Sequence, residues 1–216
     1  MPTRKFELHE AALAAIGADA STACTGRLAR MAGTHALVLD GMNLPLPVAA
    51  GVARWTRLLP HVGGSGWEGP LRADEDVLPF GDESFCAVLA RFVAVADPET
   101  LAMELARVLA PHGILLVADL HPHSLWHAGE APGRWERALR RAGLDVVPAV
   151  RCGAPWPRAH GAAGMPRWLM RGMGGAWVVE ARRRTLAAIP LRKPATGRRA
   201  VEQAGTLVPG ARRQCA

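Results

Sequence analysis

The sequence predicts an α/β protein in which a mostly parallel sheet is covered by helices on both faces. Three short apolar runs, at residues 35–39, 86–89 and 114–118, have the length and composition of strands buried on both sides. Segments with apolar residues at helical spacing lie between and after these runs. Such alternation is typical of parallel sheets, which bind ligands beyond the carboxyl ends of their strands.

The first seventy residues predict helical structure, one strand and then an irregular region. Residues 6–31 are rich in Ala and Leu, so we expect one or two helices, with breaks at Gly17 and Gly26. The run at residues 35–39 predicts the first core strand. Prolines and glycines make residues 41–70 irregular, with one helix expected at 48–59 and a second strand doubtful.

The rest of the chain predicts alternating strands and helices. Asp97 and Pro98 favour a helix start, because an Asp side chain accepts from free amides and Pro suits the first turn. Pro111 and Gly113 are expected to end that helix. The other expected elements are a strand that turns into an acidic loop at 71–80, a helix at 134–142 stopped by Gly143, and strands at 145–150 and 176–180.

The positive charge of the chain is concentrated at its C-terminal end. The 216 residues carry a net charge of +7, but residues 182–216 alone hold nine basic residues and one acid. We therefore expect one domain at residues 1–181 and a basic, partly disordered tail at 182–216. A solvated tail is the default interpretation, and since the tail lacks aromatic residues for base stacking, weak, nonspecific contact with nucleic acid is the most that it supports.

Composition argues against several classes of protein. No apolar run approaches the roughly 20 residues of a membrane helix, and residues 1–10 carry carboxylates where an export signal is apolar. A cytoplasmic protein without membrane contact is expected. No CxxC pair occurs, so neither a disulfide framework nor a zinc knuckle is predicted for the four cysteines, Cys24, Cys86, Cys152 and Cys215.

The histidines at positions 121, 123 and 127 match no standard zinc spacing, so no metal site is predicted. His121 directly follows the strand that ends in the ADL segment, and Trp126 lies five residues further on. Both are candidates for contact with a substrate. The alternative for Trp126 is a place in the core or in a lid.

The central block contains a series of motifs in a characteristic order: Asp74, LPF at 78–80, Asp82, SF at 84–85, RVL at 107–109 and ILLVADL at 114–120. In order and spacing it resembles the class I S-adenosylmethionine-dependent methyltransferases, in particular the type 11 domain. The later segments HPHSLW and GAWVVEARRR resemble a small proteobacterial subgroup. The resemblance implies a Rossmann-like methyltransferase fold, S-adenosylmethionine as cofactor and methyl transfer to an unidentified acceptor.

The resemblance also implies a set of cofactor-binding residues. The carboxylate of Asp74 corresponds to the acid that accepts from the adenine amino group, and the backbone amide of Glu75 to the one that faces the adenine ring. The other implied positions are Asp40 and Gly41 after the first strand, and the backbone of Ala90 and Arg91 after the fourth. The alternative is that these residues end strands or lie in solvated loops.

Several positions depart from the family pattern. The glycine-rich loop after the first strand is replaced by GMNLPLP, in which only Gly41 remains. Met42, Leu44 and Pro45 are expected to obstruct the close backbone approach that glycines allow. The alternative function is therefore a catalytically inactive methyltransferase-like protein with a binding or regulatory role. An open cleft above Asp40 and Asp74 favours the enzyme, and a plugged one favours the alternative.

Overall fold

The computed structural model describes residues 3–62, 66–74, 77–126 and 129–183. The chain divides into two units, Met1–Thr185 and Leu186–Ala216, of which the second lies outside the described residues. The described helices are α1 (Thr3–Leu28), α2 (Pro98–Val108), α3 (Pro132–Arg141) and α4 (Arg167–Met173). The described strands are β1 (Gly33–Asp40), β2 (Val52–Pro60), β3 (Trp67–Glu68), β4 (Phe85–Arg91), β5 (Leu109–Leu120), β6 (Leu144–Cys152) and β7 (Ala176–Arg183).

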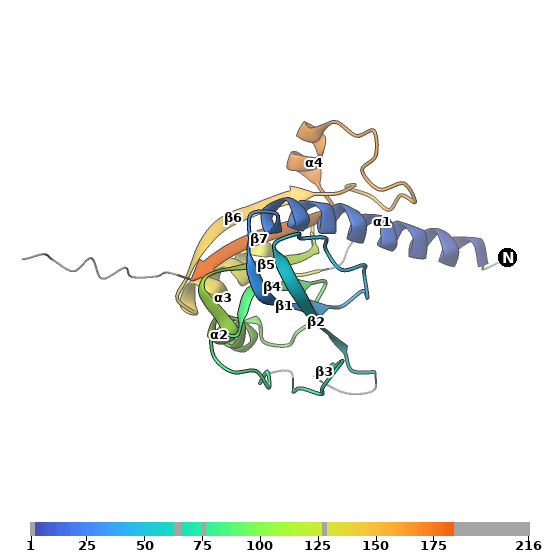
Figure 1. Ribbon diagram of the computed structural model, residues 1–216. Helices are drawn as coiled ribbons and strands as arrows, with labels where there is room; N and C mark the ends of the chain where they lie inside the picture. The colour runs from blue at the N-terminus through green and yellow to red at the C-terminus, as the bar shows by residue number, and fades with distance from the viewer. Residues whose placement is uncertain (1–2, 63–65, 75–76, 127–128, 184–216) are drawn as a thin grey trace, which may run out of the picture. The chain divides into compact units, whose positions relative to one another are not determined.

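The strands form one seven-stranded sheet in the order β3-β2-β1-β4-β5-β7-β6 (Figure 1). β1 pairs in parallel with β2 and with β4, and β4 pairs in parallel with β5. β3 is antiparallel to β2, and β7 is antiparallel to both of its neighbours. The prediction of a mostly parallel sheet is therefore only partly right, because the sheet is mixed. Its parallel part comprises β2, β1, β4 and β5, and of these the central strands β1, β4 and β5 contain the runs that are buried on both faces.

Helices cover both faces of the sheet, as predicted (Figure 1). On one face, Leu101 and Leu105 of α2 and Trp135 of α3 pack against alternate residues of the strands, such as Leu37 and Val88. On the other face, α1 packs against the intervening strand residues. Because neighbouring residues of a strand point to opposite faces, one apolar run such as Leu115–Leu116 supplies both cores.

Local signals explain most of the boundaries that were predicted correctly. The side chain of Asp97 caps α2 by accepting from the amide of Glu99 at 3.0 Å. After α3, Gly143 adopts a φ of +81°, the left-handed conformation that suits the end of a helix. β1, β4, β6 and β7 each contain the run predicted for it.

The N-terminal region differs from the prediction in two places. α1 continues through Gly17 and Gly26 without a break. Leu44 packs where a side chain at position 17 would lie, since a Cβ there would be 2.6 Å from its methyl carbon. The helix predicted at residues 48–59 is wrong, because this segment forms β2, which pairs with β1 from Val52 onward. Pairing with the exposed edge of β1 overrides the helical pattern.

The central region also differs from the prediction. The strand expected at the start of residues 71–80 is reduced to a single bridge from Ala73 to Trp67, and the short β3 comes from the preceding glycine-rich segment. β5 begins at Leu109, directly after α2, so that Pro111 and Gly113 lie within the strand. His112 there has a φ of +63°, near a shift in the pairing with β4. α4 was not predicted.

Arg182 and Arg183, the first residues of the expected tail, belong to β7. The rest of that segment lies outside the described residues. Among the helices that the structure describes, none combines the length and the apolar character needed to cross a membrane.

Candidate functional site

The carboxyl ends of β1 and β4 meet at a buried ion pair. Asp40 ends β1 and Arg91 ends β4, and the two residues are direct neighbours in the sheet register. The Nη2 of Arg91 donates to Oδ2 of Asp40 at 2.7 Å. Both side chains are almost completely buried, at 0% exposure for Asp40 and 1% for Arg91. The carboxylate predicted to contact a cofactor is therefore engaged by a side chain of its own protein.

Arg91 also holds the loop that follows β1. Its guanidinium donates to the carbonyls of Leu44 at 2.7 Å and Pro45 at 3.0 Å, and to the hydroxyl of Ser21 in α1 at 2.9 Å. From β2, Arg57 donates to the same Leu44 carbonyl at 2.6 Å. Two arginines thus clamp the loop over the ends of the central strands, in the place where a glycine-rich loop was expected.

Gly41 is explained by the packing of the backbone. Its N–H donates to the carbonyl of Arg91 at 2.9 Å, which continues the contact between β1 and β4 beyond the strand ends. A Cβ at this position would lie 1.7 Å from the carbonyl oxygen of Phe92. Only glycine fits at this distance. The close approach that Gly41 allows is therefore made to Phe92, a residue of the same chain.

A second region, beside β3, contains Asp74. This side chain is exposed and lines a cavity of about 370 Å³ together with Trp67, His61 and other residues of the neighbouring loops. Glu68 lies opposite Leu59 near the end of β2, and its carboxylate contacts Nδ1 of His61 at 2.8 Å. Asp74 is thus open to a ligand. Glu75 lies outside the described residues.

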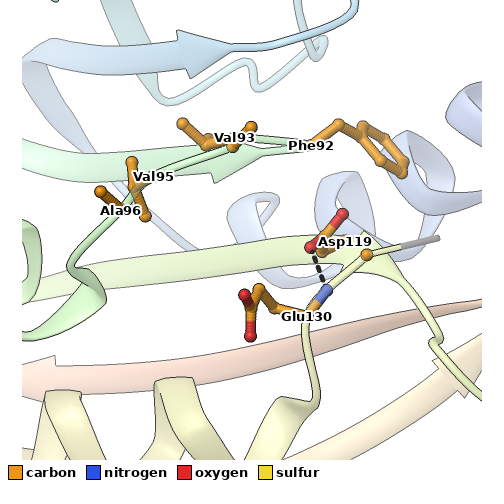
Figure 2. Close-up of a pocket in the computed structure, with 8 residues that line it drawn as sticks. Phe92, Val93, Val95, Ala96, Asp119 and Glu130 are labelled. Atoms are coloured by element: carbon orange, nitrogen blue, oxygen red, sulfur yellow. Dashed lines mark hydrogen bonds between the residues drawn. The ribbon is translucent and has the colours of Figure 1, made fainter. Parts of the chain in front are cut away.

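A third region lies between the ends of β4 and β5, where a cavity of about 480 Å³ opens. Figure 2 shows Asp119 and Glu130 facing the apolar segment with Val93 and Val95. Asp119 accepts from the amides of Leu120 at 2.7 Å and Glu130 at 2.9 Å. Burial raises the pKa of Asp119 to about 6.

The prediction did not include Asp119 or Glu130 among the site residues. The available signal for Asp119 was a carboxylate near the end of an otherwise apolar strand, in the segment ILLVADL. Such a residue lies at the edge of the sheet where ligands bind in this class of fold. Glu130 has no comparable signal, because it reaches the cavity through a loop.

The two residues predicted on the substrate side have different environments. His121 is 4% exposed and lines a further cavity of about 220 Å³ beyond the end of β5. Trp126 is buried, and its indole N–H donates to the carbonyl of Ala154 at 3.0 Å. Trp126 therefore holds two loops together. Ala90, predicted to line the cofactor pocket, is completely buried in β4.

The residues around Asp40 do not fit the amino-acid portion of S-adenosylmethionine. The Asp40 carboxylate has no exposed surface, the loop after β1 is clamped by Arg57 and Arg91, and the Gly41 backbone is packed against Phe92. Asp74 alone fits, since its exposed carboxylate could accept from an adenine amino group. The residues predicted as one continuous cofactor site are thus divided into a closed part and an open part.

No protein-family model and no curated protein matches the sequence. Among solved structures, a protein of Bacillus halodurans proposed to be a methyltransferase aligns with a TM-score of 0.54 at 17% identity, over 76% of this chain and 98% of its own. A SAM-dependent methyltransferase of Thermotoga maritima aligns with a TM-score of 0.49 at 17% identity, over 84% of this chain and 94% of its own. A SAM-dependent methyltransferase of Aquifex aeolicus also aligns with a TM-score of 0.49 at 17% identity, over 76% of this chain and 89% of its own.

The similarity to the Bacillus halodurans structure and the strand order β3-β2-β1-β4-β5-β7-β6 agree on the architecture. At 17% identity the similarity concerns the fold. The chain has the Rossmann-like fold of the class I methyltransferases, with a mixed seven-stranded sheet.

Proposed function

We propose that this chain is a catalytically inactive protein of the methyltransferase fold, which serves as a ligand-binding or regulatory protein and does not bind S-adenosylmethionine across β1 and β4. The observation that supports this function best is the buried guanidinium of Arg91, which lies between Asp40 and the carbonyls of Leu44 and Pro45 at the carboxyl ends of β1 and β4.

Binding of a cofactor at these strand ends would first require the contacts of Arg91 with Asp40, Leu44 and Pro45, here called the Arg91 cluster, to open. Separation of a buried ion pair costs about 3–5 kcal/mol when one partner is left without its counter-charge. An opening cost of that size lowers the apparent affinity of a ligand by roughly two to four orders of magnitude. The closed arrangement therefore favours a protein whose ligands bind elsewhere along the same edge of the sheet.

Three cavities at this edge support a binding role: one beside Asp74, one beside Asp119 and one beside His121. Each combines apolar walls with a few polar side chains, as ligand sites in proteins do. We place this role in the cytoplasm, in agreement with Cys24, Cys86 and Cys152, which are free thiols.

The second candidate is S-adenosylmethionine-dependent methyl transfer to an unidentified acceptor. Two observations favour it: the exposed Asp74 in a cavity with Trp67, and the buried Nε atoms of Arg57 and Arg91, which have no hydrogen-bond partner among the described residues. Two guanidinium groups beside a single carboxylate leave positive charge at the strand ends, which the carboxylate of a ligand could neutralise only once the contacts of Arg91 had opened.

Calorimetric titration with S-adenosylmethionine and with S-adenosylhomocysteine distinguishes the two functions. We expect no heat of binding and no thermal shift at millimolar ligand. The Asp74→Ala variant serves as the matched control, because Asp74 is exposed and makes no contact with the Arg91 cluster. Micromolar affinity in the natural protein that weakens in this variant would instead establish the cofactor site and the second candidate.

A further inference from the structure

The cavity that contains His121 lies between two loops at the end of the sheet, and we name it the β5–β7 cavity. It has a volume of about 220 Å³. One wall comes from the loop after β5, and the other from the end of β6 and from the connection between β6 and β7, which includes α4. Its lining residues are His121, His123, Ser124, Leu125, Arg151, Pro155, Trp156, Met173 and Gly174.

Hydrogen bonds hold the two walls at a fixed separation. The amide of His121 donates to the carbonyl of Gly175 at 2.8 Å, and the amide of Leu125 to that of Pro155 at 3.2 Å. Trp126 and Ala154 make a further contact between the same loops. A Cβ at position 175 would lie 2.2 Å from the carbonyl oxygen of Ala154, so glycine is required there. The cavity is therefore formed before any ligand binds.

The polar groups of the cavity are cationic or neutral hydrogen-bond donors. Arg151 donates one N–H to the carbonyl of Gly172 at 2.7 Å, which positions the guanidinium in the wall. Nδ1 of His121 accepts from the amide of His123 at 3.2 Å. Burial, together with the charges of Arg151 and His123, lowers the pKa of His121. The neutral ring therefore carries its proton on Nε2, which can donate.

No carboxylate lines this cavity among the described residues. The sequence shows the same bias over a wider region, since the stretch between Asp145 and Glu180 contains Arg151, Arg158, Arg167 and Arg171 but no acid. A cavity with a guanidinium, imidazoles and no acid favours an anion. A carboxylate matches the planar, two-pronged geometry of a guanidinium well.

The rest of the lining is apolar and limits the kind of anion. Leu125, Pro155, Trp156 and Met173 supply apolar surface, and Trp156 adds an aromatic face. A fully hydrated inorganic ion would gain nothing from these walls, whereas an organic anion would bury its apolar part against them. The volume limits the ligand to a small molecule.

We propose that the β5–β7 cavity binds a small organic carboxylate, held by Arg151 and His121 and packed through its apolar body against Trp156 and Leu125. This inference rests on the proposed function of a ligand-binding protein and identifies the class of its ligand. It does not involve Asp40, Arg91 or Asp74. Binding or absence of binding of S-adenosylmethionine therefore does not decide whether this cavity binds a carboxylate.

Benzoate is a suitable probe, with benzamide as its neutral analogue and inorganic phosphate as the purely ionic one. We expect benzoate to bind saturably in ligand-observed NMR and to change the intrinsic tryptophan fluorescence of the protein, to which Trp156 contributes. Benzamide should bind about tenfold more weakly, because the charge-assisted hydrogen bond to Arg151 is lost. This comparison uses the natural protein and does not depend on the folding of a variant.

Two variants locate the site. Arg151→Gln should weaken benzoate binding about tenfold and leave benzamide binding unchanged. Arg54→Gln is the matched control, since Arg54 is exposed on β2, far from β6 in the strand order, and it should leave both affinities unchanged. Equal binding of benzoate and benzamide, tighter binding of phosphate than of benzoate, or no saturable binding of benzoate would each overturn the inference.

Discussion

Asp40 and Asp74 were both predicted to bind one cofactor, yet they have opposite environments. Asp40 is completely buried and bonded to Arg91, whereas Asp74 is exposed on the wall of a cavity. The difference arises from the residue beside each carboxylate. A buried guanidinium converts the first aspartate into part of the core, whereas Arg72, the arginine that lines the cavity of the second among the described residues, is itself exposed. A motif residue therefore indicates a binding site only where its polar atoms remain accessible.

The largest expected effect is the loss of the charge on Asp40. Asp40→Asn should lower the free energy of unfolding by about 3–5 kcal/mol, because Arg91 would remain buried without a counter-charge. Denaturant unfolding followed by circular dichroism measures this directly. A loss below about 1 kcal/mol would show that the guanidinium reaches solvent when Asp40 is neutral, and the strand ends would then count as open to a ligand.

The next effect is a dependence of stability on pH that arises from Asp119. Because the pKa of this carboxyl is about 6 in the folded protein and lower in the unfolded chain, its stabilising contribution is full below about pH 4 and is lost as the pH rises through 6. In the Asp119→Asn variant the side chain does not ionise, so this loss of stability does not occur. Between pH 4 and pH 7 the natural protein should therefore lose up to about 3 kcal/mol relative to the variant.

Unfolding curves of both proteins at these two pH values test the expectation. The comparison with the Arg91-paired Asp40 is informative, since the described residues that line the cavity of Asp119 include no cation. A difference in stability that stays constant from pH 4 to pH 7 would contradict the raised pKa.

A smaller effect is expected where β1 and β4 meet. Gly41→Ala would place a Cβ against the carbonyl oxygen of Phe92, and the resulting overpacking should cost about 1–3 kcal/mol. Gly26→Ala is the matched control, because nothing lies within 4 Å of its Cβ position in α1, and it should stabilise the protein by about 0.5–1 kcal/mol. Thermal unfolding of both variants shows whether Gly41→Ala destabilises the protein and Gly26→Ala stabilises it. Equal effects would mean that the strand ends separate readily.

The smallest effect is expected at Asp74. Asp74→Ala removes an exposed carboxylate and should change the free energy of unfolding by less than about 0.5 kcal/mol. The same denaturant titration as for Asp40→Asn completes the comparison of the two aspartates. A large destabilisation would mean that Asp74 has a structural role like that of Asp40.

The elements that were predicted correctly have strong local signals. The buried run 114–118 and the cap formed by Asp97 both specify structure through neighbouring residues. β2 has no such signal, because its segment VARWTRLLP mixes arginines with apolar residues and becomes a strand by pairing with β1. α1 likewise passes through two glycines because its buried face, not its propensity, stabilises it.

The residues predicted for the candidate site have different environments in the structure. His121 lines a cavity, as a residue after a core strand can, and Asp74 is accessible. Trp126 and Ala90 are buried, and Trp126 bonds to Ala154 of another loop. Contacts of this kind join distant segments, so no pattern within one segment could reveal them.

By itself, the sequence determined the α/β class, the central strands and the resemblance to methyltransferases, since each depends on the order and spacing of nearby residues. It also showed that the glycine-rich loop is altered. Only the tertiary structure decided how the altered loop packs at the ends of β1 and β4. Arg91 and Asp40 are 51 positions apart, and the sheet register makes them neighbours. Whether a polar residue binds a ligand or another residue is a property of the folded neighbourhood, because burial and partners are set by packing.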